Sequence, residues 1–319
     1  MLTEPRATYK PIQYPWAHEY YKKQHKAHWM FEEVPMAQDI SDYNTKLSPG
    51  NRNMIGQVFR FFTTADVDVA DGYSTHYMPY FKAPEIRQMH SIFAAMEGIH
   101  IEAYSLLLET LGFHDSEMSK FLDIKAMRDK HEYLANYNMS TPHEVAKTIA
   151  MYSGFTEGVQ LFGSFAILLN FSRFNLMKGM GQIIAWSIRD ESLHVEGNSM
   201  LFRTFISENP GIWNDKLKYE IYCGAERAVE LEDAFIDVCY EGSDIPDLPK
   251  EQVKLFIRYL ADRRLLGLGL KKIFNSGDRN PLSWFDALTN GLEHANFFET
   301  RSTEYTKAST TGNLQDIFK

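Results

Sequence analysis

The stretch that decides the fold is IFAAMEGIHIEAYSLLL, residues 92–108, which has the pattern of an apolar helix with a polar motif inside it. The motif is Glu-x-x-His, formed by Glu97 and His100. Because residues three apart lie on one face of a helix, this carboxylate and this imidazole can reach the same metal ion. A charged group on a buried helix face is costly unless it is paired or binds a metal, so the apolar flanks indicate a metal site.

The same arrangement occurs again in GQIIAWSIRDESLHVEG, residues 181–197, where Glu191 and His194 form the motif. An acid also stands among apolar or small residues on the helix expected before each motif. These acids are Asp66 in FRFFTTADVDVADGY and Glu157 in YSGFTEGVQLFGSF. Two such units packed face to face would supply the carboxylates and imidazoles of a ferritin-like di-metal bundle. This ligand set suits two iron ions, two manganese ions or one of each.

An alternative is that these acids are surface residues of amphipathic helices, which the doubled motif and the apolar flanks oppose. Asp68 competes with Asp66 for the ligand role. Two residues apart is about 200° around a helix, so only one of the two can face the metals. Asp66 shares a face with Phe62, Val69 and Tyr73, which favours Asp66 as the ligand without excluding Asp68.

Long stretches of helical periodicity predict an all-α protein, a ferritin-like bundle with additional helices. Pro84, Gly112 and the Thr-Pro sequence at Thr141 mark helix ends. The expected helices cover roughly residues 52–80, 84–111, 115–136, 142–171, 176–207, 213–240 and 249–274. We expect a single domain over residues 1–300 and a polar, flexible tail over residues 301–319.

The 319 residues include 33 basic and 42 acidic side chains, and the net charge of −9 disfavours a nucleic-acid-binding protein. Cys223 and Cys239 have neither CxxC nor zinc-site spacing, so reduced thiols of a cytosolic protein are expected. The N-terminus lacks the apolar stretch of a signal peptide, and the longest apolar run, residues 161–171, is too short to cross a membrane. We therefore expect a soluble, cytoplasmic protein that binds neither membranes nor nucleic acid.

The sequence resembles the small, radical-generating subunit of class I ribonucleotide reductases over nearly its whole length. The matching segments are HWMFEEV (28–34), the helix around Asp66, MEGIHIEAY (96–104), EGVQLFGSF (157–165), RDESLH (189–194) and NFFETRSTEY (296–305). The resemblance implies that the metal ligands are Asp66, Glu97, His100, Glu157, Glu191 and His194. It also implies that Glu97 and Glu191 bridge the two ions.

Tyr104 follows His100 by one helical turn, so its ring is expected beside the metal site. In many members of the family that the sequence resembles, a tyrosine here holds a stable radical. Leu161, Phe165 and Ser187 match the positions around that ring, and Ser187 is polar where many tyrosyl-radical members carry an aliphatic residue. Two alternatives therefore stay open: a stable Tyr104 radical, and an oxidant that stays on the metals as in a manganese-only subclass.

The resemblance also implies a path for the oxidising equivalent. Trp29 matches the tryptophan that starts this path, and Asp190 matches the aspartate that links it to a metal-bound histidine, here His100. Tyr305 matches the tyrosine that relays the radical between subunits. The terminal residues Leu314–Phe318 would then be the peptide that docks on the large subunit and becomes ordered there.

By the same resemblance, the chain would be the small subunit of a ribonucleoside-diphosphate reductase. Its oxidised dinuclear metal cofactor would start the radical reduction of ribonucleotides to deoxyribonucleotides in the large subunit. A homodimer and a flavoprotein activator are further expectations. The alternatives are another ferritin-like di-metal oxidase or desaturase, which lacks the Trp29 and Tyr305 relay, and a metal-storage protein.

Overall fold

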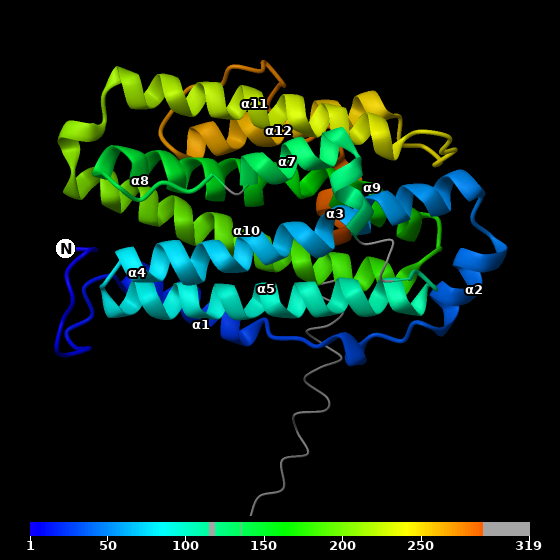
Figure 1. Ribbon diagram of the computed structural model, residues 1–319, viewed down its shortest axis with the longest axis horizontal. Coiled ribbons are helices and arrows are strands. Elements are labelled where there is room, and N and C mark those ends of the chain that lie inside the picture. The colour runs from blue at the N-terminus through cyan, green and yellow to red at the C-terminus, as the bar shows by residue number, and fades with distance from the viewer. Residues whose placement is uncertain (115–118, 135, 290–319) are drawn as a thin grey trace, which may run out of the picture.

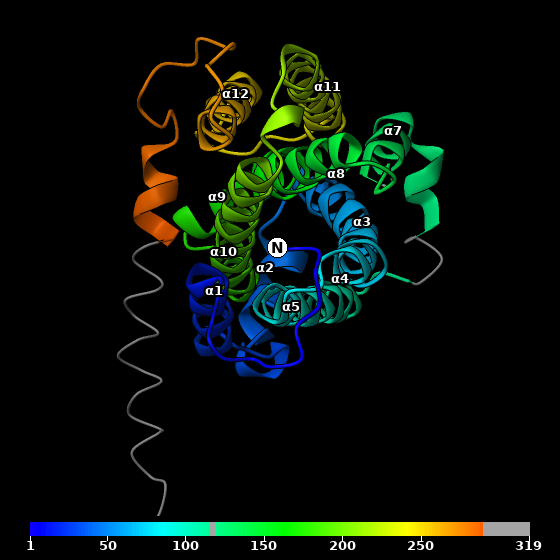
Figure 2. The same ribbon diagram turned by 90° about the vertical axis from the view of Figure 1, so that its left-hand side faces the viewer.

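The computed structural model describes residues 1–114, 119–134 and 136–289 of the chain. These residues form helices and connecting segments without a strand, which confirms the predicted all-α fold. The long helices run side by side in Figure 1, and Figure 2 gives an end-on view of the same bundle. The predicted tail over residues 301–319, with Tyr305 in it, lies outside the described residues.

Four helical segments surround the centre of the bundle (Figure 2). They are α3 (Pro49–Asp71), α5 (Pro84–Thr110), α8 (Pro142–Ile149) with its continuation Ala150–Gln160, and α10 (Lys178–Glu208). The helices that pack around them are α1 (Pro15–Lys26), α7 (Lys125–Leu134), α9 (Phe162–Arg173), α11 (Asp215–Cys239) and α12 (Lys250–Gly267). The shorter helices α2 (Ala37–Thr45) and α4 (Met78–Tyr80) lie before α3 and α5.

Several helix ends follow the expected capping chemistry. Pro84 stands at the start of α5, and the Thr141 side chain caps α8 by accepting a hydrogen bond from the Glu144 amide at 3.2 Å. Gly112, just beyond α5, has a φ of 87°, which lies in the left-handed region that favours glycine. These short signals therefore placed the ends of two core helices correctly.

The helix predicted over residues 249–274 is shorter than expected, since α12 ends at Gly267. Gly269, just beyond the helix, ends it with a φ of 83° in the left-handed region, and the Asp262 carboxylate then accepts hydrogen bonds from the backbone amides of Ile273 and Phe274 at 2.9 and 3.0 Å. The chain is thus held in a turn against the helix instead of continuing it. This contact joins residues about three helical turns apart, so local periodicity could not predict it.

Within the described residues, the α-helical segments that the sequence did not predict are α1, α2 and residues 283–289. Helix α1 buries only Ala17 and Gln24. A helix that buries so few residues has little apolar periodicity. Because apolar periodicity is what predicts a helix from sequence, α1 could not be predicted in this way.

Two segments near the bundle centre are wound more widely than an α-helix. Gly72–Tyr77 and Ala150–Gln160 are π-helical, whereas the periodicity predicted ordinary helix at both places. Such segments are rare and occur frequently at functional sites. The second one carries Glu157, so its winding sets the direction in which this carboxylate points.

Among the residues that the structure describes, no helix has the combination of length and apolar character that crossing a bilayer requires. Cys223 and Cys239 are both free thiols, as expected.

A buried ion pair joins the outer helices α7 and α11 and contacts the end of the π-helical segment Ala150–Gln160. Lys130 Nζ on α7 lies 2.6 Å from Glu232 Oε2 on α11, and neither side chain is exposed. The same ammonium lies 3.9 and 4.0 Å from the ring centroids of Phe61 and Phe235, and it donates to the carbonyl of Gln160 at 3.1 Å. Burial raises the pKa of Glu232 to about 7 and lowers the pKa of Lys130. Each partner therefore depends on the other to stay charged.

Replacing Lys130 by Met should reduce the free energy of unfolding by about 3–5 kcal/mol, because Glu232 would lose its partner without gaining solvent. The loss should be larger near pH 8 than near pH 5. A carboxyl group whose pKa is raised in the folded state destabilises the fold as the pH rises above its unfolded pKa. Urea denaturation at the two pH values measures this.

The matched control is the double variant Lys130→Met/Glu232→Met, which replaces both charges by apolar side chains of similar length. It should recover most of the lost stability. A double variant as unstable as Lys130→Met would show that packing, and not the unpaired carboxylate, causes the loss.

Candidate metal centre

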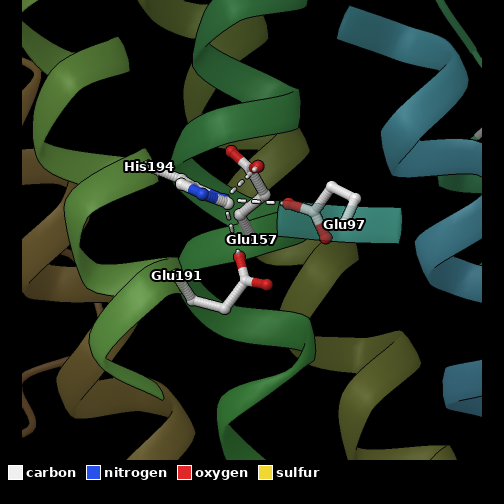
Figure 3. A group of neighbouring side chains, drawn as sticks. All are labelled: Glu97, Glu157, Glu191 and His194. Atoms are coloured by element: carbon white, nitrogen blue, oxygen red, sulfur yellow. Dashed lines mark ion pairs between the residues drawn. The ribbon is translucent and has the colours of Figure 1, made fainter. Parts of the chain in front are cut away.

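The predicted ligand side chains converge at the centre of the bundle. They are Asp66 from α3, Glu97 and His100 from α5, Glu157 from the π-helical segment, and Glu191 and His194 from α10. At most 1% of each side chain is exposed. Their ligand atoms form two groups, each with all atoms within 4.8 Å of one another. The groups are Glu97, Glu157, Glu191 and His194, drawn in Figure 3, and Asp66, Glu97 and His100.

Glu97 and Glu191 lie between the two imidazoles. Glu97 has Oε1 at 2.8 Å from Nδ1 of His194 and Oε2 at 3.3 Å from Nδ1 of His100. Glu191 has Oε2 at 3.6 Å from Nδ1 of His194 and Oε1 at 3.3 Å from Nδ1 of His100. Each carboxylate therefore presents one oxygen to each half of the cluster, as a bridging ligand must.

Burial and mutual contact shift the protonation of these groups. Burial raises the pKa of Glu157 to about 7, and burial together with the nearby Glu97 raises that of Asp66 well above its usual value. Burial also opposes the charge on Glu97, but His194 and His100 outweigh it and lower the pKa to about 2. The four carboxylates outnumber the two imidazoles, so the buried cluster favours added positive charge.

The donor atoms fit a pair of metal ions. Among the described residues, Oδ2 of Asp66 and Oε2 of Glu191 are buried and have no hydrogen-bond partner. A buried carboxylate oxygen without a partner is costly, and carboxylate oxygens with imidazole nitrogens suit iron and manganese. Asp68 does not join the cluster: it is half-buried and forms an ion pair with His131 at 2.6 Å.

Trp29 is buried against the cluster and connects to it through Asp190. Trp29 Nε1 donates to Asp190 Oδ2 at 2.7 Å, and the same oxygen lies 3.3 Å from Nε2 of His100. Burial opposes the charge on Asp190, yet these hydrogen bonds hold its pKa below the usual value. The other carboxylate oxygen accepts from Gln24 Nε2 at 2.8 Å. Sequence reasoning missed Gln24, because nothing in the polar helix α1 distinguishes it.

Tyr104 also lies beside His100, with the two ring centroids 6.1 Å apart. Its ring packs against Phe59 and Phe62 at centroid distances of 5.7 and 5.1 Å. Burial raises the pKa of the Tyr104 hydroxyl, and hydrogen bonding to Ser187 opposes that rise in part. The pocket is thus aromatic and dry apart from one serine, as the sequence indicated.

Sequence reasoning also missed a hydrogen-bonded network behind Glu157. Tyr73 donates to Glu157 Oε1 at 2.5 Å, and Asn198 Nδ2 donates to the Tyr73 hydroxyl at 2.8 Å. Asn198 Oδ1 in turn lies 3.1 Å from Nε2 of His90, and all these side chains are buried. A signal was available, because Asn198 follows His194 by one helical turn on a buried helix face.

The remaining predicted residues, Tyr305 and the peptide Leu314–Phe318, lie outside the described residues.

Known proteins resemble this chain in sequence and in fold. The family model "Ribonucleotide reductase, small chain" matches residues 6–281. The probable ribonucleoside-diphosphate reductase small subunit 376L of Invertebrate iridescent virus 6 is 40% identical, over 99% of this chain and 98% of its own length.

Two solved structures resemble the fold. The dimanganese(II)-NrdF of Streptococcus sanguinis has a TM-score of 0.75 and 22% identity, covering 91% of this chain and 99% of that one. The Rnr4 homodimer of Saccharomyces cerevisiae has a TM-score of 0.73 and 19% identity, covering 96% of this chain and 92% of that one. With a family match over most of its length and a close relative that spans all of it, this chain belongs to the ribonucleotide reductase small-chain family.

Proposed function

We propose that this chain acts as the small subunit of a ribonucleoside-diphosphate reductase and generates the oxidising equivalent with which a large subunit reduces ribonucleotides. The observation that carries the proposal is the position of Glu97 and Glu191, each of which offers one oxygen to each of two imidazoles. This arrangement suits two ions held side by side, and membership of the family supports the same cofactor.

The residues that would hold the dinuclear metal centre are Asp66, Glu97, His100, Glu157, Glu191 and His194. The candidate ions are two manganese, two iron or one of each, because the same oxygen and nitrogen ligands suit both metals. When bound, such a centre supplies the one-electron redox chemistry that amino-acid side chains cannot start by themselves.

The chain's own residues would then guide the electron and the proton. Asp190 receives hydrogen bonds from Trp29 and His100 on one oxygen, so it fixes the indole relative to an imidazole ligand. The same oxygen is placed to take the Nε1 proton when the Trp29 indole is oxidised. Tyr305 is the next redox residue in this proposal.

The proposed partners follow from the family. They are the large subunit, docked through the tail residues Leu314–Phe318, a second copy of this chain and an activating flavoprotein. The homodimer of the yeast structural neighbour supports the second copy. A cytoplasmic location is supported by the free thiols Cys223 and Cys239.

Metal analysis tests the centre directly. Wild-type chain reconstituted with Mn²⁺ or Fe²⁺ should bind two ions, and Glu97→Ala should lose both, because Glu97 belongs to both ligand groups. Asp66→Ala should chiefly lose the ion on the His100 side. Glu102→Ala is the matched control, since Glu102 is an exposed acid on the same helix. Full occupancy in Glu97→Ala would contradict the proposal.

The relay has a separate test. Trp29→Phe keeps an aromatic ring but removes the Nε1 donor, so ribonucleotide reduction with the large subunit should fall by about a hundredfold or more. Metal content should not change. Trp213→Phe, in another part of the bundle, should keep normal turnover. Normal turnover in Trp29→Phe would exclude Trp29 from the path.

The site of the stored oxidant can be resolved with Tyr104→Phe. If the radical resides on Tyr104, this variant loses turnover and the tyrosyl signal in electron paramagnetic resonance while it keeps both ions. If the oxidant stays on the metals, the variant keeps turnover. The substitution leaves the Phe59 and Phe62 contacts available in either case.

A further inference from the structure

The aromatic surroundings of the cluster differ from one side to the other. On the Tyr104 side the neighbouring rings are phenylalanines, Phe59, Phe62 and Phe165. On the Glu157 side they include the tyrosines Tyr73, Tyr77, Tyr137 and Tyr152. Phenylalanine would pack as well without a buried hydroxyl, which needs a partner. Phenols, unlike benzene rings, can be oxidised by one electron at potentials that proteins reach.

The tyrosines form a continuous series from the cluster to the surface. Tyr73 donates to Glu157 at 2.5 Å, and its ring centroid is 5.4 Å from that of Tyr152. The Tyr152 ring is 5.3 Å from Tyr137, which stacks on His76 at 4.5 Å with an interplanar angle of 16°. Tyr73 and Tyr152 are buried, whereas Tyr137 and His76 are half-buried.

Each hydroxyl in the series donates a hydrogen bond to a fixed acceptor. Tyr152 donates to the carbonyl of Val69 at 2.5 Å, and Tyr137 donates to the carbonyl of Asp68 at 3.2 Å. The backbone also leaves room for the outermost ring: a Cβ at Gly72 would lie 2.5 Å from the Tyr137 hydroxyl oxygen. Only glycine at this position allows Tyr137 to approach so closely.

We propose that Tyr73, Tyr152 and Tyr137 form a second electron-transfer path, by which a one-electron reductant at the His76 surface reduces the Glu157 side of the oxidised centre. This inference rests on the proposed function, which supplies the oxidised centre. It differs from the Trp29 path in its direction through the bundle and in its partner, which is a small reductant and not the large subunit.

The electrons and protons balance along the path. The external reductant loses one electron, and the oxidised centre gains one. Each tyrosine passes its electron inward while its proton shifts within the existing hydrogen bond without leaving it, and the proton shifts back when the next electron arrives from outside. Each tyrosine returns to its starting phenol form after the electron has passed, so the path can act repeatedly. The consequence is that an oxidant not used by the large subunit is removed without damage to the core.

The test uses the full-length chain, loaded with metal and oxidised, and mixed anaerobically with hydroquinone. Stopped-flow absorption and electron paramagnetic resonance follow the reduction of the centre. Tyr152→Phe and Tyr137→Phe should each slow this reduction by about tenfold or more. Both variants keep their rings, so metal content and unfolding temperature should match the wild type. Those two measurements separate a loss of electron transfer from a structural effect.

The matched control is Tyr133→Phe. Tyr133 is a nearby tyrosine whose hydroxyl donates to the carbonyl of Gly224 at 3.1 Å, outside the series. The oxidised centre of the Tyr133→Phe variant should be reduced at the wild-type rate. Unchanged rates in both Tyr152→Phe and Tyr137→Phe, with the centre intact, would overturn the path and leave the proposed function standing. A wild-type chain that binds no metal pair would overturn both.

Discussion

The structure depends on one electrostatic constraint: four carboxylates and two imidazoles are held together with almost no access to water. Removing one such ion from solvent costs several kcal/mol, and like charges at these distances repel. The cluster can therefore persist only where added positive charge compensates it. The constraint accounts for the apolar flanks on every helix that contributes a ligand, because those flanks exclude water and make cation binding favourable.

Backbone geometry meets this constraint through the π-helical segments. The segment Ala150–Gln160 presents Glu157, and the segment Gly72–Tyr77 presents Tyr73, which donates to that same carboxylate. The carbonyl of Gln160, at the end of the segment Ala150–Gln160, accepts a hydrogen bond from the buried Lys130. The ion pair of Lys130 with Glu232 is thus connected through one turn of backbone to a predicted metal ligand. The ion pair that stabilises the outer helices therefore also helps to hold the backbone that orients Glu157.

The sequence was informative wherever a contact repeats at helical spacing. The Glu97/His100 and Glu191/His194 pairs follow from which residues share a helix face. The choice of Asp66 over Asp68 also needed the family resemblance, and the structure brings the chosen residues together. Features set by distant packing could not be predicted. The Gln24 contact with Asp190 and the Asp262 contact with the backbone of Ile273 depend on residues that meet only after the chain has folded.

The surroundings of the cluster explain how one buried centre can support different electron routes. The phenylalanines around Tyr104 are neither proton acceptors nor easily oxidised rings, so they would offer no route for an oxidising equivalent on that side. On the His100 side, Trp29 would provide an oxidisable ring and its partner Asp190 a proton acceptor. On the Glu157 side, Tyr73 would provide the oxidisable ring and Glu157 the proton acceptor. In the proposed function the ligands would set what is stored, and the polarity of the neighbouring rings would set the direction in which the oxidising equivalent can leave.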